Sequence, residues 1–286
     1  MSGGSLSWEE AVVSLRAQPD SAELILNCYY DDPLLGAAQR FQQSEEWQAT
    51  RRLLPPGAGQ ALDMGAGRGI ASYALACAGW DVVAAEPDPS ALVGAGAIRQ
   101  LARDSGLTIA VVENEAEALK LADGEFDLVY GRAVLHHARD LERVGREVHR
   151  VLKPGGRFLA VREHVISRSA DLPVFLASHP LHRLYGGENA RTLPEYLAAF
   201  AAAGFHRVRT LGPFDNAVNF FPMATEDWRI RCAQSLIRRV GFRIGMLAVN
   251  ERHVAGRALL GFLSRRLSCR DDTPGRLYSF VMDKSL

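Results

Sequence analysis

The chain has 286 residues, of which 48% are hydrophobic and 23% are charged, an ordinary composition for a globular protein. Thirty-three basic residues balance thirty-three acidic ones, so the molecule as a whole has no bulk attraction to nucleic acid, and we expect no nucleic-acid partner. The four cysteines are scattered without a C-x-x-C pair, which argues against disulfides or a cysteine zinc site and favours a reducing, cytoplasmic location.

The N-terminal segment reads as helical and precedes any strand signal. Residues 33–54 carry apolar side chains at helical spacing, namely Leu35, Ala38, Phe41 and Trp47. Residues 55–59, with two prolines and two glycines, break this pattern. Residues 1–5 lack the regions of a secretory signal, and no apolar run reaches the roughly 18 residues of a membrane span. We therefore expect a helical cap over residues 1–56.

From residue 60 the pattern changes to short apolar runs that alternate with helical stretches. The runs that read as strands are residues 61–64, 81–85, 108–112, 126–130 and 157–161. Strands that alternate with helices form right-handed crossovers, which give a parallel sheet covered on both faces. The fold class is therefore α/β, with a nucleotide-binding core over residues 57–166.

After Arg162 the alternation stops for about thirty residues, and we expect residues 167–193 to form a lid or substrate loop without regular structure. The rest of the core then follows over residues 194–286, with a helix at 194–203 and strands at 207–211 and 277–282. Between these two strands we expect a mainly helical insertion at 213–273.

The most informative segment is the glycine turn between the first strand and its helix. Glycines stand at positions 65, 67 and 69, and Asp63 precedes them. Glycine permits a tight turn and the close approach of a ligand to the backbone. The dinucleotide fingerprint needs a glycine where this chain has Ile70, and Asp63 would repel a pyrophosphate. The turn therefore indicates a cationic ligand with an amino group.

Acidic residues follow at the ends of the next two strands. Glu86 ends the second strand, about twenty residues beyond the glycines, where an acid accepts hydrogen bonds from both ribose hydroxyls. Residues 114–119 follow the third strand and contain Glu115, so an acid and a backbone N–H at that edge can contact an adenine ring.

These landmarks, with the Leu-Lys-Pro-Gly-Gly segment at 152–156, resemble the successive motifs of class I S-adenosylmethionine-dependent methyltransferases. The resemblance covers residues 57–165 closely and 194–211 loosely. It implies a Rossmann-like, seven-stranded, mainly parallel sheet with an antiparallel last strand. It also implies S-adenosyl-L-methionine as cofactor and S-adenosyl-L-homocysteine as product. Many family members carry Asp where this chain has Glu115.

The resemblance also assigns cofactor-binding residues. Asp63 and the glycine turn hold the methionine end, Glu86 holds the ribose, and Glu115 and Ala116 meet the adenine. The full set that we expect is Asp63, Gly65, Ala66, Gly67, Gly69, Glu86, Pro87, Glu115, Ala116 and Arg132.

The loops after the fourth and fifth strands should face the methyl group, because ligands bind beyond the carboxyl ends of parallel strands. These loops and the 167–193 segment hold five of the eight histidines. Methyl transfer needs the acceptor positioned and, for a hydroxyl, its proton removed, a task for histidine near neutral pH. We expect His137 or His164 as the base and Glu163 as its orienting partner. The substrate residues that we expect are His136, Arg162, His179, His182 and Tyr185.

Other uses of these residues stay open at this point. His164, His179 and His182 could instead hold a metal, but their spacing is not a zinc signature, so we expect none. Residues 228–270 contain ten arginines and a single acid, Glu251, which makes contact with an anionic membrane possible but not favoured. The leading function is methyl transfer to an oxygen or nitrogen of a small, acidic or sugar-type metabolite. The alternatives are a peripheral membrane methyltransferase on a lipid-linked substrate and a cofactor-binding module without catalysis.

Overall fold

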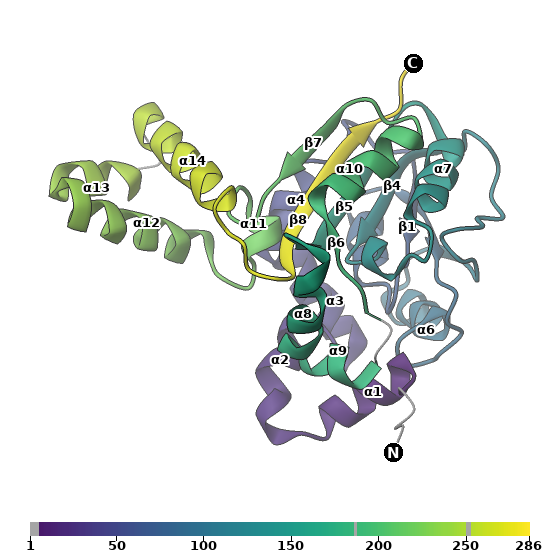
Figure 1. Ribbon diagram of the computed structural model, residues 1–286. Coiled ribbons are helices and arrows are strands. Elements are labelled where there is room, and N and C mark those ends of the chain that lie inside the picture. Colours follow the sequence, from purple (N-terminus) through teal and green to yellow (C-terminus); the bar gives the residue numbers. More distant parts are fainter. Residues whose placement is uncertain (1–5, 186–187, 250–252) are drawn as a thin grey trace.

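The computed structural model describes residues 6–185, 188–249 and 253–286, and at its centre lies one twisted sheet (Figure 1). The strands run in the order β3-β2-β1-β4-β5-β8-β7, with the short β6 beside the end of β5. Strands β1 to β5 pair in parallel, whereas β8 is antiparallel to both β5 and β7. This arrangement confirms the expected Rossmann-like fold class. The strands are β1 (Gln60–Met64), β2 (Asp81–Ala85), β3 (Ile109–Val112), β4 (Phe126–Arg132), β5 (Leu152–Ile166), β6 (Arg191–Thr192), β7 (Val208–Leu211) and β8 (Arg276–Asp283).

Helices cover both faces of the sheet, because successive strand residues point to opposite faces. In β1, Ala61 packs into a core with α3 to α6, and its neighbour Leu62 packs into a second core with α7 and α10. The covering helices are α3 (Leu34–Gln43), α4 (Glu45–Arg51), α5 (Ile70–Cys77), α6 (Ala95–Ser105), α7 (Leu141–Val151) and α10 (Leu193–Ala202).

We expected residues 167–193 to be an irregular loop, and that expectation was wrong. The N-terminal part of the cap packs beside this segment. Residues 167–193 form a 3-10 turn (Ser169–Asp171) and the helices α8 (Leu172–Ser178) and α9 (Pro180–Tyr185), while residues 186–187 lie outside the described part. Pro173 and Pro180 each lie in the first turn of a helix, where the missing N–H is not needed. Leu181 packs against α1 (Trp8–Arg16), near α2 (Ala22–Asn27) (Figure 1).

A helical arm projects from the core before the last strand (Figure 1). It consists of α12 (Thr225–Val240), α13 (Phe242–Val249) and α14 (Val254–Ser268), preceded by the short α11 (Ala217–Phe220). Trp228 joins the base of the arm to the core, since its ring stacks on Phe214 at 4.6 Å and its indole N–H donates to Ser264. None of the described helices combines the length and the apolar character needed to cross a membrane.

Candidate active site

A cavity of about 830 Å³ opens at the carboxyl ends of β1, β2 and β4. All but two of the site residues expected from the sequence line it, the exceptions being Gly69 and Glu163. Ala133, directly after β4, and Arg162, at the register shift within β5, both have positive φ angles (53° and 60°), which residues other than glycine rarely adopt. Such backbone conformations concentrate at functional sites, and both residues line this cavity, which supports its assignment as a functional site.

The glycine turn forms one wall of the cavity. The N–H groups of Gly65 and Ala66 donate to the carbonyl of Ala85 at 2.8 and 3.2 Å, which joins the turn to the end of β2. Gly65 has a φ of 64°, and a Cβ added there would lie 2.2 Å from Cγ2 of Val134. Only glycine therefore allows this close approach. Gly69 instead is the N-cap residue of α5 and packs near Ile98.

Asp63 lies almost fully buried beneath the turn, and the hydroxyl of Ser72 donates to it at 2.5 Å. Burial raises the pKa of Asp63 to about 7, against the opposing effect of the Ser72 hydrogen bond. Because the pKa of this carboxyl group lies near neutral pH, a cation beside it would favour the ionised form. Asp63 thus fits the amino group of a bound amino-acid moiety.

Glu86 stands at the end of β2 with its carboxylate fixed by two backbone groups. The N–H of Gly67 donates to one oxygen at 2.7 Å, and that of Asp88 donates to the other at 3.0 Å. Each of its two oxygens keeps a second lone pair, which can accept a hydrogen bond from a hydroxyl of a bound diol. At the end of β3, the buried Asn114 and the exposed Glu115 line the next part of the cavity, where an adenine ring would lie.

The N-terminal cap closes over the turn through Arg68. Its buried guanidinium donates to the carbonyl oxygens of Tyr29 and Asp31 at 3.0 and 2.9 Å and also pairs with Asp32. Tyr30 and Trp8 consequently line the cavity as well. A ligand seated on the glycine turn would be enclosed from this side.

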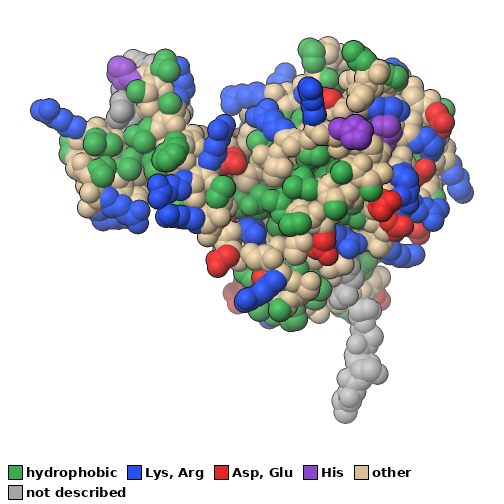
Figure 2. Space-filling model, turned by 45° about the horizontal axis from the view of Figure 1, so that its top comes forward, with side chains coloured by type: hydrophobic (Ala, Val, Ile, Leu, Met, Phe, Trp, Pro, Cys, Tyr) green, Lys and Arg blue, Asp and Glu red, His purple; other side chains and the backbone are tan. Residues whose placement is uncertain are grey.

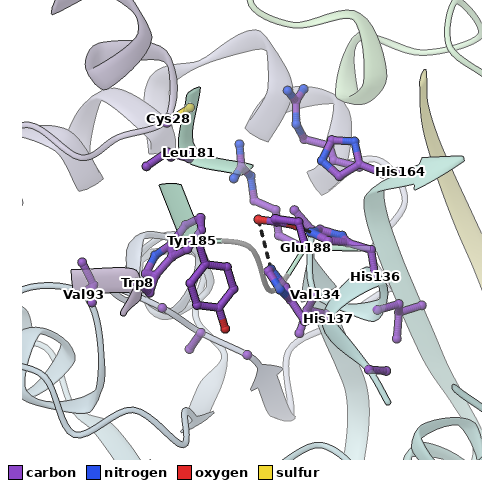
Figure 3. A pocket seen from close by; sticks show the side chains of 18 of the residues that line it. Trp8, Cys28, Val93, Val134, His136, His137, His164, Leu181, Tyr185 and Glu188 are labelled. Carbon is purple, nitrogen blue, oxygen red and sulfur yellow. Dashed lines mark ion pairs between the residues drawn. The ribbon is translucent and has the colours of Figure 1, made fainter. Parts of the chain in front are cut away.

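The opposite wall is a cluster of histidines and glutamates (Figure 3). Glu163 is fully buried and accepts hydrogen bonds from the N–H groups of Val134, Leu135 and His136 at 3.1–3.2 Å. Its carboxylate also contacts Nδ1 of His136 at 3.0 Å. A register shift in β5 between Ala160 and Glu163 turns Glu163 toward this loop, so it orients His136 rather than His137 or His164.

Glu188 joins the cluster from the segment after α9. Its side chain is 2% exposed and lies between His136 and His137 (Figure 3). Burial opposes a charge on His136, but the carboxylates of Glu163 and Glu188 outweigh it and raise the pKa of His136 to about 9. Burial and the nearby His136 lower the pKa of His137 to about 4. Glu188 was not among the site residues expected from the sequence, although it stands six residues after His182 within one short segment.

The other expected histidines lie around this cluster. His164 is half-buried, and its Nδ1 contacts the carbonyl of Gly275 at 2.9 Å. His179 stacks on His182 at 4.5 Å. Tyr185 packs edge-on against Trp8 at 5.1 Å and faces the cavity (Figure 3). His137, whose side chain is 36% exposed, is therefore the expected base that is most accessible to an acceptor.

Arg132 and Arg162 are tied into the wall of the cavity. Arg132 forms a two-point ion pair with the fully buried Glu46, at 2.6 and 3.1 Å. Arg162 donates to the carbonyl oxygens of Val218 and Phe221 and lies 3.8 Å from the same carboxylate. Both guanidinium groups therefore have partners within the protein, and both also line the cavity.

Known proteins resemble this chain in its central part. Residues 62–160 match the family model described as a methyltransferase domain. An uncharacterised methyltransferase of Bacillus subtilis, YcgJ, is 31% identical over 50% of this chain and 55% of its own length. A ubiquinone biosynthesis O-methyltransferase of Methylobacterium nodulans is 31% identical over 57% and 66%. The chain spans about half the length of the curated relatives it matches.

Solved structures agree on the fold. A phosphoethanolamine N-methyltransferase of Haemonchus contortus in complex with S-adenosylhomocysteine has a TM-score of 0.56 at 15% identity, covering 98% of this chain and 61% of its own. YcgJ has a TM-score of 0.51 at 20% identity, covering 85% and 98%. The expected recognition and its cofactor are thus confirmed: the chain contains a methyltransferase domain of the class I family that depends on S-adenosylmethionine.

Proposed function

We propose that this protein transfers the methyl group of S-adenosylmethionine to an oxygen or nitrogen atom of a small metabolite. One observation carries the proposal: Asp63, the glycine turn and Glu86 line the same cavity as the cluster around His137. A cofactor site and a polar acceptor wall therefore share one cavity, as direct transfer between two bound molecules requires.

The residues present fit the cofactor. Bound there, S-adenosylmethionine would supply a methyl group already activated by its sulfonium. Asp63 would hold the amino group, the fixed carboxylate of Glu86 would hold the ribose hydroxyls, and the turn at Gly65 and Gly67 would admit the chain between them. These residues place the cofactor, and the cap tied down by Arg68 would exclude water from it.

The acceptor would lie against the side chains that face the cavity from the other wall. His137 and Tyr185 offer polar groups there, whereas Arg132 and Arg162 are engaged with Glu46. This favours an acceptor with a hydroxyl or amine over one with an acidic group. The O-methyltransferases among the relatives support an oxygen acceptor.

The proposal is tested by turnover with S-adenosylmethionine labelled on its methyl group, against a panel of small hydroxyl and amine metabolites. Label in a product, lost with Glu86→Gln but retained with Glu113→Gln, would support it. Glu113 is a matched control, because it is an exposed acid at the end of the neighbouring strand, paired with Arg99. Cofactor binding without turnover on any acceptor would favour the alternative of a non-catalytic binding module.

A second candidate, action on a lipid-linked substrate at a membrane, is favoured by the helical arm. Figure 2 shows hydrophobic and basic side chains together on this projecting lobe. Phe242, Val254 and Phe262 are 67%, 72% and 59% exposed there, amid the arginines of residues 228–270. An apolar and basic surface suits an anionic bilayer.

Vesicle flotation separates this candidate from the first. We expect binding to anionic but not zwitterionic vesicles at low salt, and its loss when Arg238, Arg239 and Arg243 are changed to Glu. The matched control reverses three exposed arginines of the core, Arg99, Arg103 and Arg146. Absence of flotation, or equal loss in the control, would remove the candidate.

A further inference from the structure

We propose that His136, His137 and Glu188, joined by His182, bind a divalent transition-metal ion at the wall of the cavity. From the sequence we expected no metal, and the only candidate ligands were His164, His179 and His182, because nothing in the sequence indicated that Glu188 lies among the histidines. Metal binding itself does not depend on the proposed function, but its consequence for catalysis does.

The donor atoms have the separations that a metal needs. Oε2 of Glu188 lies 3.1 Å from Nε2 of His136, and Oε1 lies 3.9 Å from Nε2 of both His137 and His182. One donor atom from each of His136, His137 and Glu188 lies within 4.8 Å of the others. With metal–ligand distances of about 2.0–2.1 Å, tetrahedral ligands stand roughly 3.4 Å apart. These separations exceed that spacing by at most about 1.4 Å, so movements of about 1 Å or less in each side chain would close the site.

The imidazole of His136 is already oriented as a ligand. Glu163, held by three backbone N–H groups, occupies its Nδ1 side at 3.0 Å. This leaves Nε2 directed at Glu188. A carboxylate behind the far nitrogen of a metal-binding histidine fixes the ring and strengthens its donor atom.

Oε2 of Glu188 is inaccessible to solvent, and Nε2 of His136 lies 3.1 Å away from it. In the metal-free protein, a proton on the ring joins these two buried atoms. Buried carboxylate oxygens need such a partner, because leaving one without it is costly. A metal cation bound here would take the place of that proton and contact both atoms.

The donor set indicates the class of metal. Two or three imidazoles and one carboxylate suit Zn²⁺, Fe²⁺, Co²⁺ or Ni²⁺, whereas Mg²⁺ and Ca²⁺ favour oxygen ligands. His137 faces the cavity. With His136, His137 and Glu188 as ligands, a fourth position would stay open to an acceptor oxygen, whereas His182 as the fourth ligand would require a five-coordinate metal. On this proposal His137 acts as a ligand rather than as a free base.

The test is titration of metal-stripped protein with Co²⁺, followed by its visible absorption spectrum and by equilibrium dialysis. We expect one equivalent of bound Co²⁺, displaced by Zn²⁺. Glu188→Gln and His137→Gln are expected to weaken binding by about 100-fold or more, and Glu163→Gln by about 10- to 100-fold. His253→Gln, which removes an exposed histidine on the arm, is the matched control and should bind normally.

Two results would overturn the proposal: less than stoichiometric binding by the wild type, or binding that Glu188→Gln and His137→Gln leave intact. S-adenosylhomocysteine binding is measured on the same stripped preparations and also reports folding of the variants. If S-adenosylhomocysteine binds while Co²⁺ does not, the metal-site proposal is contradicted and the proposed function is not. If Co²⁺ binds while that compound does not, the proposed function fails and the metal site stands.

Discussion

The backbone N–H of Gly67 donates a 2.7 Å hydrogen bond to Oε2 of Glu86, which connects the turn after β1 to the acid at the end of β2. The two residues are 19 positions apart in the chain, but the parallel pairing of β1 with β2 brings them to the same edge of the sheet. The group that would hold a ribose is thereby positioned by the turn that would hold the amino-acid moiety.

Glu86 and Asp63 are expected to act on different parts of the ligand. Glu86→Gln should weaken both S-adenosylhomocysteine and 5′-methylthioadenosine by roughly 10- to 100-fold, because each loses a charged hydrogen bond of about 1.5–3 kcal/mol. Asp63→Asn should weaken only the former, since 5′-methylthioadenosine has no amino-acid moiety. Isothermal titration calorimetry measures both ligands, and equal losses for both in Asp63→Asn would contradict this assignment.

Affinity for S-adenosylhomocysteine is expected to rise as the pH increases through about 7. Burial raises the pKa of Asp63 from its ordinary range to about 7, so the free protein holds this carboxyl protonated below that pH. The ligand's ammonium group requires the ionised form, and protonation therefore competes with binding. Dissociation constants between pH 5.5 and 8.5 measure the effect. Asp63→Asn should flatten the profile near pH 7, and an unchanged profile would count against this role.

The same shift gives the free protein an opposite trend in stability. A folded-state pKa above the unfolded value of about 3.9 means that the contribution of Asp63 to stability is full below that value and is lost as the pH rises toward 7. Asp63→Asn is therefore expected to raise the melting temperature of the free protein at pH 8 relative to wild type, with little difference at pH 4. A lower melting temperature at pH 8 would show that the carboxylate has a favourable partner there.

Gly65→Ala is expected to destabilise the protein by about 1–3 kcal/mol, because the new methyl group would meet Val134 and the backbone has a positive φ. Gly57→Ala isolates the backbone effect, since Gly57 has a φ of 87° and no atom within 4 Å of its added Cβ. It should cost about 1 kcal/mol or less. Urea unfolding measures the free energy of unfolding of both variants. Val134→Ala should restore part of the stability lost in Gly65→Ala when the two are combined, but should not stabilise the protein alone.

Arg68→Ala is expected to loosen the N-terminal cap. It removes the hydrogen bonds to the carbonyl oxygens of Tyr29 and Asp31 from a buried position, at a cost of about 2 kcal/mol. Limited proteolysis should cut the segment before β1 faster than in wild type. Arg99→Ala, which breaks an exposed pair, should leave the cleavage rate unchanged. Equal rates for all three proteins would mean that Arg68 does not secure the cap.

The cofactor half of the site could be predicted from the sequence because its signals are local and the topology does the rest. Asp63, Gly65 and Glu86 each stand at the carboxyl end of a strand, and parallel strands bring those ends to one edge. Alternating apolar runs similarly indicated the strands of the sheet.

The acceptor half depends on contacts that no local pattern encodes. Glu163 orients His136 because a bulge in β5 redirects it, and Glu188 reaches the histidines only through the path of α8 and α9. The prolines of α8 and α9 resembled loop signals in the sequence, but each lies in the first turn of its helix. Likewise, the pairing of Arg132 with Glu46 required α4 to pack beside the end of β4.

The acid-flanked glycine turn is expected to bind S-adenosylmethionine. Equilibrium dialysis of the labelled cofactor against wild type and the Asp63→Asn/Glu86→Gln double variant measures this binding. We expect one molecule bound per chain in the wild type and an affinity at least about 100-fold weaker in the folded double variant. Equal binding by the two proteins, or none by the wild type, would contradict the account.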